Sequence, residues 1–394
     1  MQDRFAVRPM TFVQHIGLAM NPRIPLARAD GAAHAADHAP PSAAAGLGGN
    51  PRHTLCDVAP SVRRLRVALG IFFSLLFFVS PWLVSAQSRP MSLSLPVVCE
   101  VGVTCLVQKL FDHDPSIERR DLRCGTLTTD GHDGVDIRLR TINDMQMGYA
   151  VVASAAGQVL RTRDGEPDVS SRQRTDLNGR DAGNGVVIDH GDGWQTQYSH
   201  LRQASITVKP GQRVAAGDRL GLIGMSGNAE FPHLHFTVRH QGKAIDPFVG
   251  TAPFDKCSAV ARGPGLWQPA AARVLSYAPT VIIMAGLASD VPPKSVADRP
   301  TPPMLKGPQA SILMWIDMIG ARPGDTQEFR ITGPGDRVVH EQQTIVEKGG
   351  LSWFAYSGKR RPATGWASGG YAGRYVLRRG GKIVAQTDAS GVIR

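Results

Sequence analysis

Several motifs that would indicate a function are missing from this 394-residue sequence. No run of Lys or Arg interleaved with aromatic residues occurs, so we expect no nucleic-acid partner. No Cys-x-x-Cys pair occurs, which disfavours a zinc site built from the five cysteines. No His-Glu-x-x-His occurs either, which excludes a helical zinc motif that carries its own glutamate base. The net charge is +11, of which the exported part would keep 11 − 4 = +7; such a basic surface suits an anionic polymer or an envelope surface, and it equally serves solubility.

The first part of the chain has the composition of a leader that is not folded. Residues 1–61 are rich in Ala, Pro, Gly, Arg and His, contain a low-complexity run at 32–49, and show no sustained apolar period. We expect this leader to be disordered. Because a signal sequence normally begins close to its arginines, the true translation start is predicted near Val62.

Residues 62–86 have the three parts of a signal peptide. Three arginines precede the apolar run 67–84, and the small-residue site Val84-Ser85-Ala86 follows it. Cleavage after Ala86 would make the protein periplasmic or secreted. The competing interpretation is a retained membrane anchor, because the 20 residues from 67 to 86 could span a bilayer. Pro81, which breaks a helix, and the cleavage site favour the signal peptide.

An exported chain keeps four of the five cysteines, since Cys56 lies in the leader. An even number of cysteines in an exported protein predicts disulfides. Local spacing favours Cys99 with Cys105, which leaves Cys124 to pair with Cys257. Zinc binding by these thiols is the weaker alternative.

A His-x-His pair lies within a stretch that reads as a β-strand. Side chains alternate between the two faces of a strand, so His233 and His235 would share one face, and Leu234 and Phe236 the other. Two imidazoles on one face are a common way to offer ligands to zinc, although an isolated pair is more often a surface or core feature. A second cluster of candidate ligands elsewhere in the sequence is therefore needed before a zinc site can be predicted.

The second cluster is Gly131-His132-Asp133-Gly134-Val135-Asp136. In a straight strand the α-carbons of His132 and Asp136 would lie roughly 13 Å apart, too far for two donors to one ion. A bend is required, and Gly134 permits one. Together with His235 these residues would make a three-ligand set with a fourth position for water, which is typical of a catalytic zinc site.

A third segment, 185–201, alternates around a Gly-Asp-Gly turn and predicts a β-hairpin that ends at His200. Between β-like stretches, residues 161–180 carry many Arg, Asp and Ser residues without an apolar period. We expect them to form a surface loop near a groove mouth, where loops commonly determine specificity. The remaining histidines of the folded part are expected to be solvent-exposed and without function: His113, His190, His240 and His340.

Three motifs in this order resemble those of the lysostaphin-type (LytM-type) zinc metallopeptidases, which cut peptide bonds of bacterial peptidoglycan. They are His-x-Gly-x-Asp at 132–136, Tyr-Ser-His at 198–200 and Pro-His-Leu-His-Phe at 232–236. The resemblance covers 124–247 and implies an antiparallel β-sheet peptidase core. By position it implies that His132, Asp136 and His235 bind zinc (Zn2+) and that His200 and His233 serve catalysis. We favour His233 as the base and His200 near the oxyanion, but the sequence does not divide these roles.

The C-terminal part, 263–394, contains short β-like stretches separated by Gly and Pro. They lie at 280–284, 311–316, 328–331, 336–340, 375–378 and 383–387. This pattern predicts an immunoglobulin-like β-sandwich. Trp315, Trp353 and Trp366 are expected to fill its core rather than to bind sugar. The whole chain is therefore predicted to be all-β, with an N-terminal extension at 87–123, a metallopeptidase domain at 124–262 and this sandwich.

Two functions of different classes follow from this organisation. The first is an exported zinc endopeptidase that hydrolyses peptidoglycan stem peptides or cross-links, with the sandwich docking it to the wall or to an envelope protein. The second is a non-catalytic protein that binds peptidoglycan or regulates other wall hydrolases. A filled set of ligands favours the first, because the inactive members of the family lack metal ligands. A membrane would be a partner only if the signal segment were retained.

Overall fold

The computed structural model describes residues 91–174, 176–252, 254, 265–293, 305 and 310–394. The predicted leader 1–61 and the signal peptide 62–86 therefore lie outside the described residues. Within the described ranges, no helix combines the length and the apolar character needed to cross a membrane. The described chain is almost entirely β-structure, which confirms the predicted fold class.

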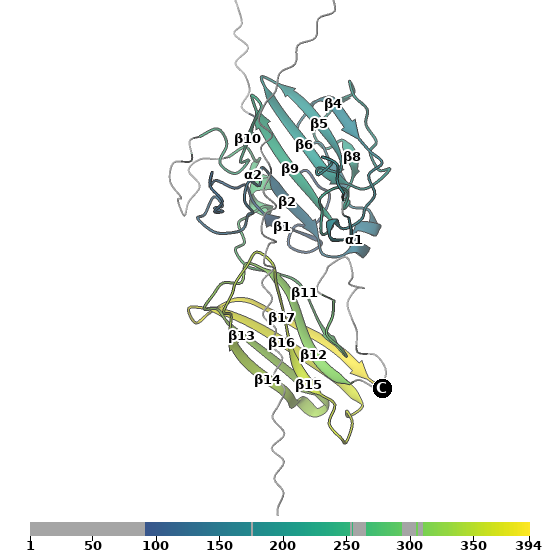
Figure 1. Ribbon diagram of the computed structural model, residues 1–394, viewed down its shortest axis with the longest axis vertical. Helices are drawn as coiled ribbons and strands as arrows, with labels where there is room; N and C mark the ends of the chain where they lie inside the picture. Colours follow the sequence, from purple (N-terminus) through teal and green to yellow (C-terminus); the bar gives the residue numbers. More distant parts are fainter. Residues whose placement is uncertain (1–90, 175, 253, 255–264, 294–304, 306–309) are drawn as a thin grey trace, which may run out of the picture. The chain divides into compact units, whose positions relative to one another are not determined.

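An antiparallel sheet of eight strands forms the first β-domain (Figure 1). Its order is β1-β2-β9-β6-β5-β4-β7, and β10 pairs with the far end of β9. The strands are β1 (Cys105–Lys109), β2 (Val135–Leu139), β4 (Gly157–Arg163), β5 (Asn184–Gly191), β6 (Trp194–Leu201), β7 (Arg213–Val214), β9 (His233–His240) and β10 (Lys243–Ile245). A smaller sheet pairs β3 (Ala150–Val152) with β8 (Arg219–Leu222). Two of the three motifs thus lie on neighbouring strands, β9 and β6.

Strand β9 alternates as predicted. Leu234, Phe236 and Val238 are fully buried in the hydrophobic core, so the odd-numbered residues of the strand face the other side of the sheet. The core face of β9 packs against apolar residues from β2, β5 and β6. This alternation fixes His233 and His235 on a common polar face.

A short α-helix, α1 (Ile142–Met147), lies between β2 and β3 of this domain. It begins with a capping box, in which Thr141 and Asp144 exchange side-chain to backbone hydrogen bonds, and it ends at Gly148 in the left-handed conformation. The capping residues Thr141 and Gly148 therefore determine where the helix begins and ends.

The N-terminal extension is part of the sheet. Strand β1 pairs with β2, while Leu93 and Val97 are buried in the same core. A disulfide joins Cys99 to Cys105 at the start of β1, as predicted. Cys124 is also disulfide-bonded. Its predicted partner, Cys257, lies outside the described residues, so that pairing stays a prediction.

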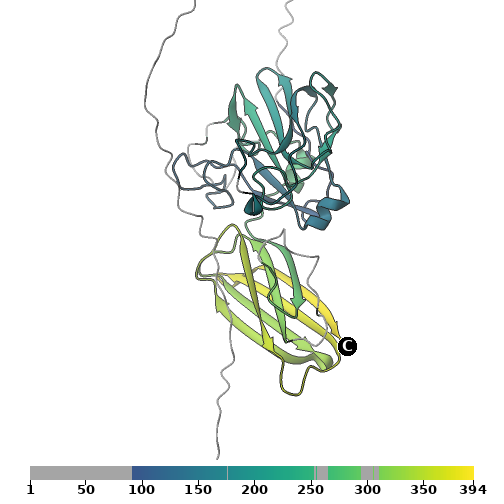
Figure 2. The ribbon, with the colours of Figure 1, turned by 45° about the vertical axis from the view of Figure 1, so that its right-hand side comes forward.

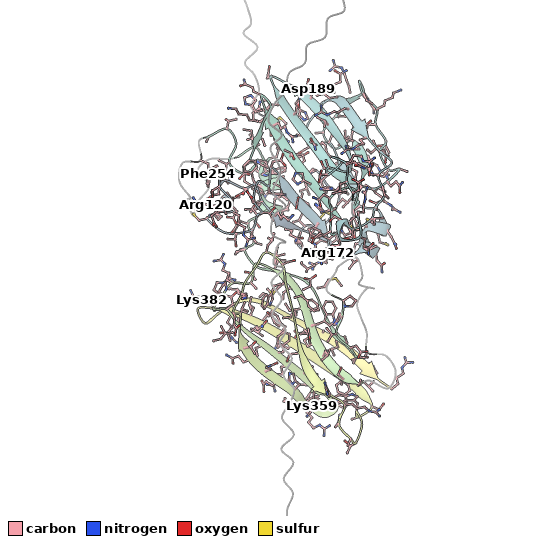
Figure 3. All side chains as sticks on the ribbon, in the orientation of Figure 1. Arg120, Arg172, Asp189, Phe254, Lys359 and Lys382 are labelled. Atoms are coloured by element: carbon pink, nitrogen blue, oxygen red, sulfur yellow. A yellow bond between two sulfur atoms is a disulfide. The ribbon has the colours of Figure 1, made fainter. Side chains whose placement is uncertain are left out.

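The predicted surface loop begins later than expected, because β4 extends through Arg163. The loop from 164 to 183 contains a short 3-10 helix, η1 (Ser171–Gln173). Arg172, labelled in Figure 3, pairs with Glu230 at 2.8 Å. The loop carboxylate Glu166 is paired twice, with Arg174 and Arg180 at 3.2 Å each. Ion pairs and backbone hydrogen bonds thus order a segment that has no apolar period.

The core of the first domain extends past the predicted boundary at Gly263, which itself lies outside the described residues. Leu266, Trp267 and Leu275 are buried in this core, and helix α2 (Pro269–Val274) lies between them. Trp267 packs 5.6 Å from the ring of Phe236 in β9. The described residues from Leu266 to Leu275 therefore contribute to the first core.

The C-terminal part forms two further antiparallel sheets (Figures 1 and 2). One contains β11 (Val281–Ala288), β12 (Ser311–Ile319) and β15 (Trp353–Arg360). The other runs β14 (Arg337–Ile345), β13 (Thr326–Gly333), β16 (Gly369–Arg379) and β17 (Lys382–Ile393). Residues of both sheets share one hydrophobic core, which confirms the predicted sandwich. All six predicted stretches are strands, whereas β15 was missed.

The three tryptophans of the sandwich are buried or partly buried. Trp315 and Trp353 are almost completely buried, and Trp366 is partly buried against the shared core. Trp353 therefore fills the core as predicted, whereas Trp315 lies in a separate buried cluster with Ala288, Leu313 and Tyr356.

Candidate metal centre

Five candidate residues from separate parts of the sequence meet on the polar face of the first sheet. Across the ladders, Asp136 in β2 lies opposite His235 in β9, and His235 lies opposite Ser199 in β6. His132 precedes β2, His233 begins β9, and His200 follows Ser199. Antiparallel pairing thus brings together residues that are about a hundred positions apart in the chain.

The three predicted ligands lie close enough to hold one ion. Oδ1 of Asp136 is 3.0 Å from Nε2 of His132 and 2.8 Å from Nδ1 of His235. One donor atom from each residue lies within 4.8 Å of the others. Two imidazole nitrogens and one carboxylate oxygen are donors that zinc prefers, and three protein ligands are typical of a catalytic site.

The other nitrogen of each ligand imidazole is held by a hydrogen bond. Nδ1 of His132 donates to the carbonyl of Leu110 at 2.7 Å, because a carbonyl can only accept. Nε2 of His235 lies 3.0 Å from Oδ1 of Asp133. These contacts leave Nε2 of His132 and Nδ1 of His235 facing Asp136. Contacts of this kind orient histidine ligands in metal sites.

Charge in the centre is balanced around a buried carboxylate. Burial by itself would raise the pKa of Asp136, but favourable electrostatic interactions with His132, Lys109 and His233 outweigh it and hold that pKa well below its usual range. Burial would lower the pKa of His235, yet hydrogen bonds to Asp133 and Asp136 raise it to about 9. A metal ion that binds here must therefore displace a proton from His235.

His233 and His200 are placed beside the ligands rather than among them. Nδ1 of His233 donates to the carbonyl of Phe231, and Nδ1 of His200 donates to that of Ser226, both at 2.8 Å. Burial lowers the pKa of His233 to about 4. Burial, together with the nearby His233 and His235, also lowers the pKa of His200 well below its usual value. Both rings are neutral near pH 7, with Nε2 able to accept a proton.

The position of His200 departs from simple strand alternation. Its φ is +61°, in the left-handed region that a residue other than glycine rarely adopts. Regular alternation would point His200 the same way as Tyr198, which is fully buried in the core. Instead its ring lies 4.6 Å from that of His233. The backbone kink therefore turns His200 towards the centre.

Gly134 allows the close approach that the His132–Asp136 contact needs. A Cβ at this position would lie 2.5 Å from the carbonyl oxygen of Phe236 and 2.9 Å from Nε2 of His235. The sequence predicted a glycine that permits a bend. The structure adds that β9 and a ligand imidazole pack directly against its backbone.

Two residues of the centre were not predicted. Lys109 in β1 places Nζ 3.2 Å from Oδ2 of Asp136. Asp133 contacts His235 through Oδ1 and Arg239 through Oδ2, the latter at 3.1 Å. The place of Asp133 beside His132 in the sequence could have suggested its role. Nothing in the sequence around Lys109 could, because only strand pairing brings it to the site.

The prediction that the remaining histidines are solvent-exposed was wrong, because all four are partly buried: His113, His190, His240 and His340. His113 stacks 3.7 Å from the ring of Phe254 and pairs with Asp246 at 2.7 Å. His190 lies 2.7 Å from the carbonyl oxygen of Ala156. These contacts join residues that are distant in the sequence, so the local sequence around each histidine did not predict them.

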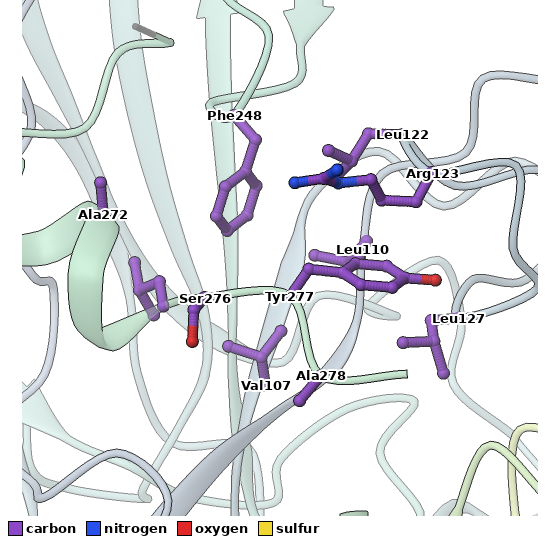
Figure 4. A pocket seen from close by; sticks show the side chains of 11 residues that line it. Val107, Leu110, Leu122, Arg123, Leu127, Phe248, Ala272, Ser276, Tyr277 and Ala278 are labelled. Atoms are coloured by element: carbon purple, nitrogen blue, oxygen red, sulfur yellow. The ribbon is translucent and has the colours of Figure 1, made fainter. Parts of the chain in front are cut away.

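A cavity of about 230 Å³ lies elsewhere in this domain, beside β1 (Figure 4). Its lining is mostly apolar and includes Val107 and Phe248. The guanidinium of Arg123 lies 5.9 Å from the ring centroid of Tyr277 at its edge. None of the five candidate residues lines this cavity, so it is separate from the metal centre.

Comparison with known proteins identifies a family for the segment that carries the centre. Residues 130–247 match the model of Peptidase family M23, and this segment is an M23 (LytM-type) domain, as the motifs predicted. Peptidoglycan DD-endopeptidase ShyA of Vibrio cholerae is 34% identical over 122 residues, which are 31% of this chain and 23% of that protein. Murein hydrolase activator EnvC of Escherichia coli is 39% identical over 62 residues, 16% of this chain and 14% of that protein.

A solved structure of a zinc-containing peptidase from Vibrio cholerae matches with a TM-score of 0.28 and 23% identity, over 42% of this chain and 41% of that one. The chain thus spans less than a quarter of the length of the two relatives described above.

Proposed function

We propose that this protein is an exported zinc-dependent endopeptidase that hydrolyses peptide bonds in peptidoglycan stem peptides or cross-links. The observation that carries the proposal is the sharing of Oδ1 of Asp136 by His132 and His235, with the outer nitrogen of each imidazole already engaged. Such a set of donors is suited to one divalent ion with an open position. The match to Peptidase family M23 supports the substrate class.

In this proposal His132, Asp136 and His235 would hold zinc. When bound, zinc supplies Lewis-acid chemistry, which activates water at neutral pH and polarises the scissile carbonyl. His233 and His200 are neutral near pH 7, and in each ring Nδ1 donates to a backbone carbonyl, which leaves Nε2 as the basic nitrogen. Each can therefore take a proton from the attacking water and return it to the leaving amine. Nε2 of His233 lies 3.8 Å from Oδ1 of Asp136, which favours His233 as the first proton acceptor.

Export and partners complete the proposal. Cleavage after Ala86 would release residues 87–394 into the periplasm or the medium, which fits two disulfide-bonded segments in the described chain. The C-terminal sandwich would dock the enzyme to peptidoglycan or to an envelope protein. Its core tryptophans are buried, so docking would use its surface residues.

The proposal is tested by incubating the purified protein with peptidoglycan sacculi and identifying the released fragments by mass spectrometry. We expect peptide cleavage together with about one zinc per chain, measured by elemental analysis. Asp136→Asn should lose both zinc and activity, whereas His233→Ala should keep zinc and lose activity. His240→Gln, which changes a histidine stacked on Trp194 away from the centre, is the matched control.

A non-catalytic role would give a different result. The protein would then bind sacculi without releasing fragments, and His233→Ala would bind as well as the wild type. Stimulation of a second wall hydrolase by such an inactive protein would identify it as a regulator, the activity for which EnvC is named.

A further inference from the structure

A second cavity, of about 190 Å³, lies on the sheet face that carries the metal centre. Gln197 and Ser199 of β6 line one side of it, and Arg161 and Arg163 of β4 line the other. Ser199 is the residue directly opposite the ligand His235 in the β6–β9 ladder. The cavity therefore begins next to the centre and leads away from it across the sheet.

Polar contacts connect this cavity to the metal ligands. Nη1 of Arg239 donates to Oε1 of Gln197 at 2.9 Å, and Nη2 of Arg239 reaches Asp133, the partner of His235. Nε2 of Gln197 in turn donates to Oγ of Ser199 at 2.9 Å. The wall of the cavity and the outer contacts of the centre thus form one hydrogen-bonded row.

The far wall of the cavity carries positive charge that no described carboxylate balances. Neither Arg161 nor Arg163 forms an ion pair within the described ranges, whereas the nearby Glu166 is already held by two other arginines. Nε of Arg163 donates to the carbonyl of Gly183 at 2.6 Å, which holds that guanidinium at the cavity and leaves its terminal nitrogens available. Two guanidinium groups in this setting suit a carboxylate, which arginine can bind through two parallel hydrogen bonds.

Strand register gives the distance across the sheet from β9, which carries His235, to β4, which carries Arg161. Thr237 in β9, Gln197 in β6, Val187 in β5 and Arg161 in β4 lie opposite one another in turn. Three strand spacings amount to about 14 Å. An extended peptide covers that distance in about four residues at roughly 3.3 Å each, and the length of the arginine side chains shortens the requirement.

We propose that Arg161 and Arg163 form a subsite that binds a free carboxylate of the peptide substrate, a few residues from the cleaved bond. The proposal rests on the proposed endopeptidase function, and it adds a preference for acidic peptides. It also gives a role to the first residues of 161–180, the segment that was predicted to be a loop that determines specificity. Stem peptides with free carboxylates would then be better substrates than the same peptides with carboxamides.

The test compares one cross-linked stem-peptide dimer with its carboxylates free and the same dimer after conversion to carboxamides. We expect the wild type to prefer the free acid by roughly 10- to 100-fold in kcat/KM, the range for hydrogen bonds to a charged group. Arg161→Gln/Arg163→Gln should bring that ratio close to one. Arg213→Gln/Arg219→Gln removes the same charge from exposed strand positions that do not line the cavity, and it should keep the preference.

Binding of both peptides to the full-length protein, measured by calorimetry, separates this proposal from the proposed function. If neither peptide is cleaved but the acid still binds more tightly and only the Arg161/Arg163 variant loses that difference, the subsite stands and the enzyme assignment fails. Equal use and equal binding of the two peptides by the wild type would overturn the subsite. So would a preference that survives in a folded Arg161→Gln/Arg163→Gln protein.

Discussion

Nζ of Lys109 lies 3.2 Å from Oδ2 of Asp136, the residue opposite it in the β1–β2 ladder. The two imidazole ligands contact the other oxygen of the same carboxylate. Asp136 is fully buried, whereas the Lys109 side chain is 22% exposed. The N-terminal extension thus supplies the positive neighbour of one oxygen of the carboxylate, and the two candidate imidazoles contact the other.

Replacing Lys109 by Met should destabilise the metal-free protein by about 1–3 kcal/mol, because a buried carboxylate loses a positive neighbour. Zinc brings its own positive charge, so the rise in melting temperature on adding zinc should be larger for Lys109→Met than for the wild type. Thermal melts with chelator and with zinc measure this. Lys243→Met, at an exposed position of β10, is the control. Equal zinc-induced shifts in both variants would contradict the role given to Lys109.

Asp133 should determine how tightly the centre holds zinc. Its Oδ1 accepts from Nε2 of His235, and loss of such an outer contact typically weakens metal binding by about 10- to 100-fold. We therefore expect this loss for Asp133→Ala, and a smaller loss for Asp133→Asn, which keeps an acceptor oxygen. Competition with a zinc chelator gives both affinities. The role would be refuted by an alanine variant that binds zinc as tightly as the wild type.

Tyr198 should matter for stability and not for metal binding, because its side chain lies on the core face of β6. Its hydroxyl accepts a hydrogen bond from the backbone nitrogen of Ser154 at 2.7 Å. Tyr198→Phe leaves that buried donor without its acceptor, which should lower the free energy of unfolding by about 1–3 kcal/mol. Urea unfolding measures the loss. Zinc affinity should stay within about twofold of the wild type, and a large fall in it would show that the two faces are coupled.

His190 should make stability depend on pH. Burial lowers its pKa, so the unfolded chain binds the proton more readily than the folded one. Stability from this group is therefore present above about pH 6.5 and is lost as the pH falls below that value. In His190→Gln this loss is absent, so the difference in unfolding free energy between wild type and variant should shrink from about pH 7.5 to about pH 5.5. A constant difference over that range would disprove the effect.

Local chemistry was enough to identify most of the site. His-x-His on a strand predicts two imidazoles on one face, and β9 has that alternation because Leu234 and Phe236 are buried on the other. The order of the three motifs led to His132, Asp136 and His235, whose donor atoms do lie together. Glycine and proline between short apolar stretches likewise predicted the sandwich, since turn residues are local signals.

Other features depend on contacts that no short segment contains. Lys109 reaches Asp136 only because β1 is paired with β2, and His200 reaches His233 only because its backbone adopts φ +61°. Alternation alone would have buried His200 in the core. His113 was expected at the surface, yet it packs on Phe254 and pairs with Asp246 from beyond β9.

Residue types and their spacing therefore determined which groups can bind a metal and which strands carry them, because side-chain alternation and turn preference act over a few residues. Strand pairing and backbone kinks determined which of those groups meet and which charges surround them. The reason is that these contacts join positions that are distant in the sequence, and their energies depend on burial that exists only in the folded sheet.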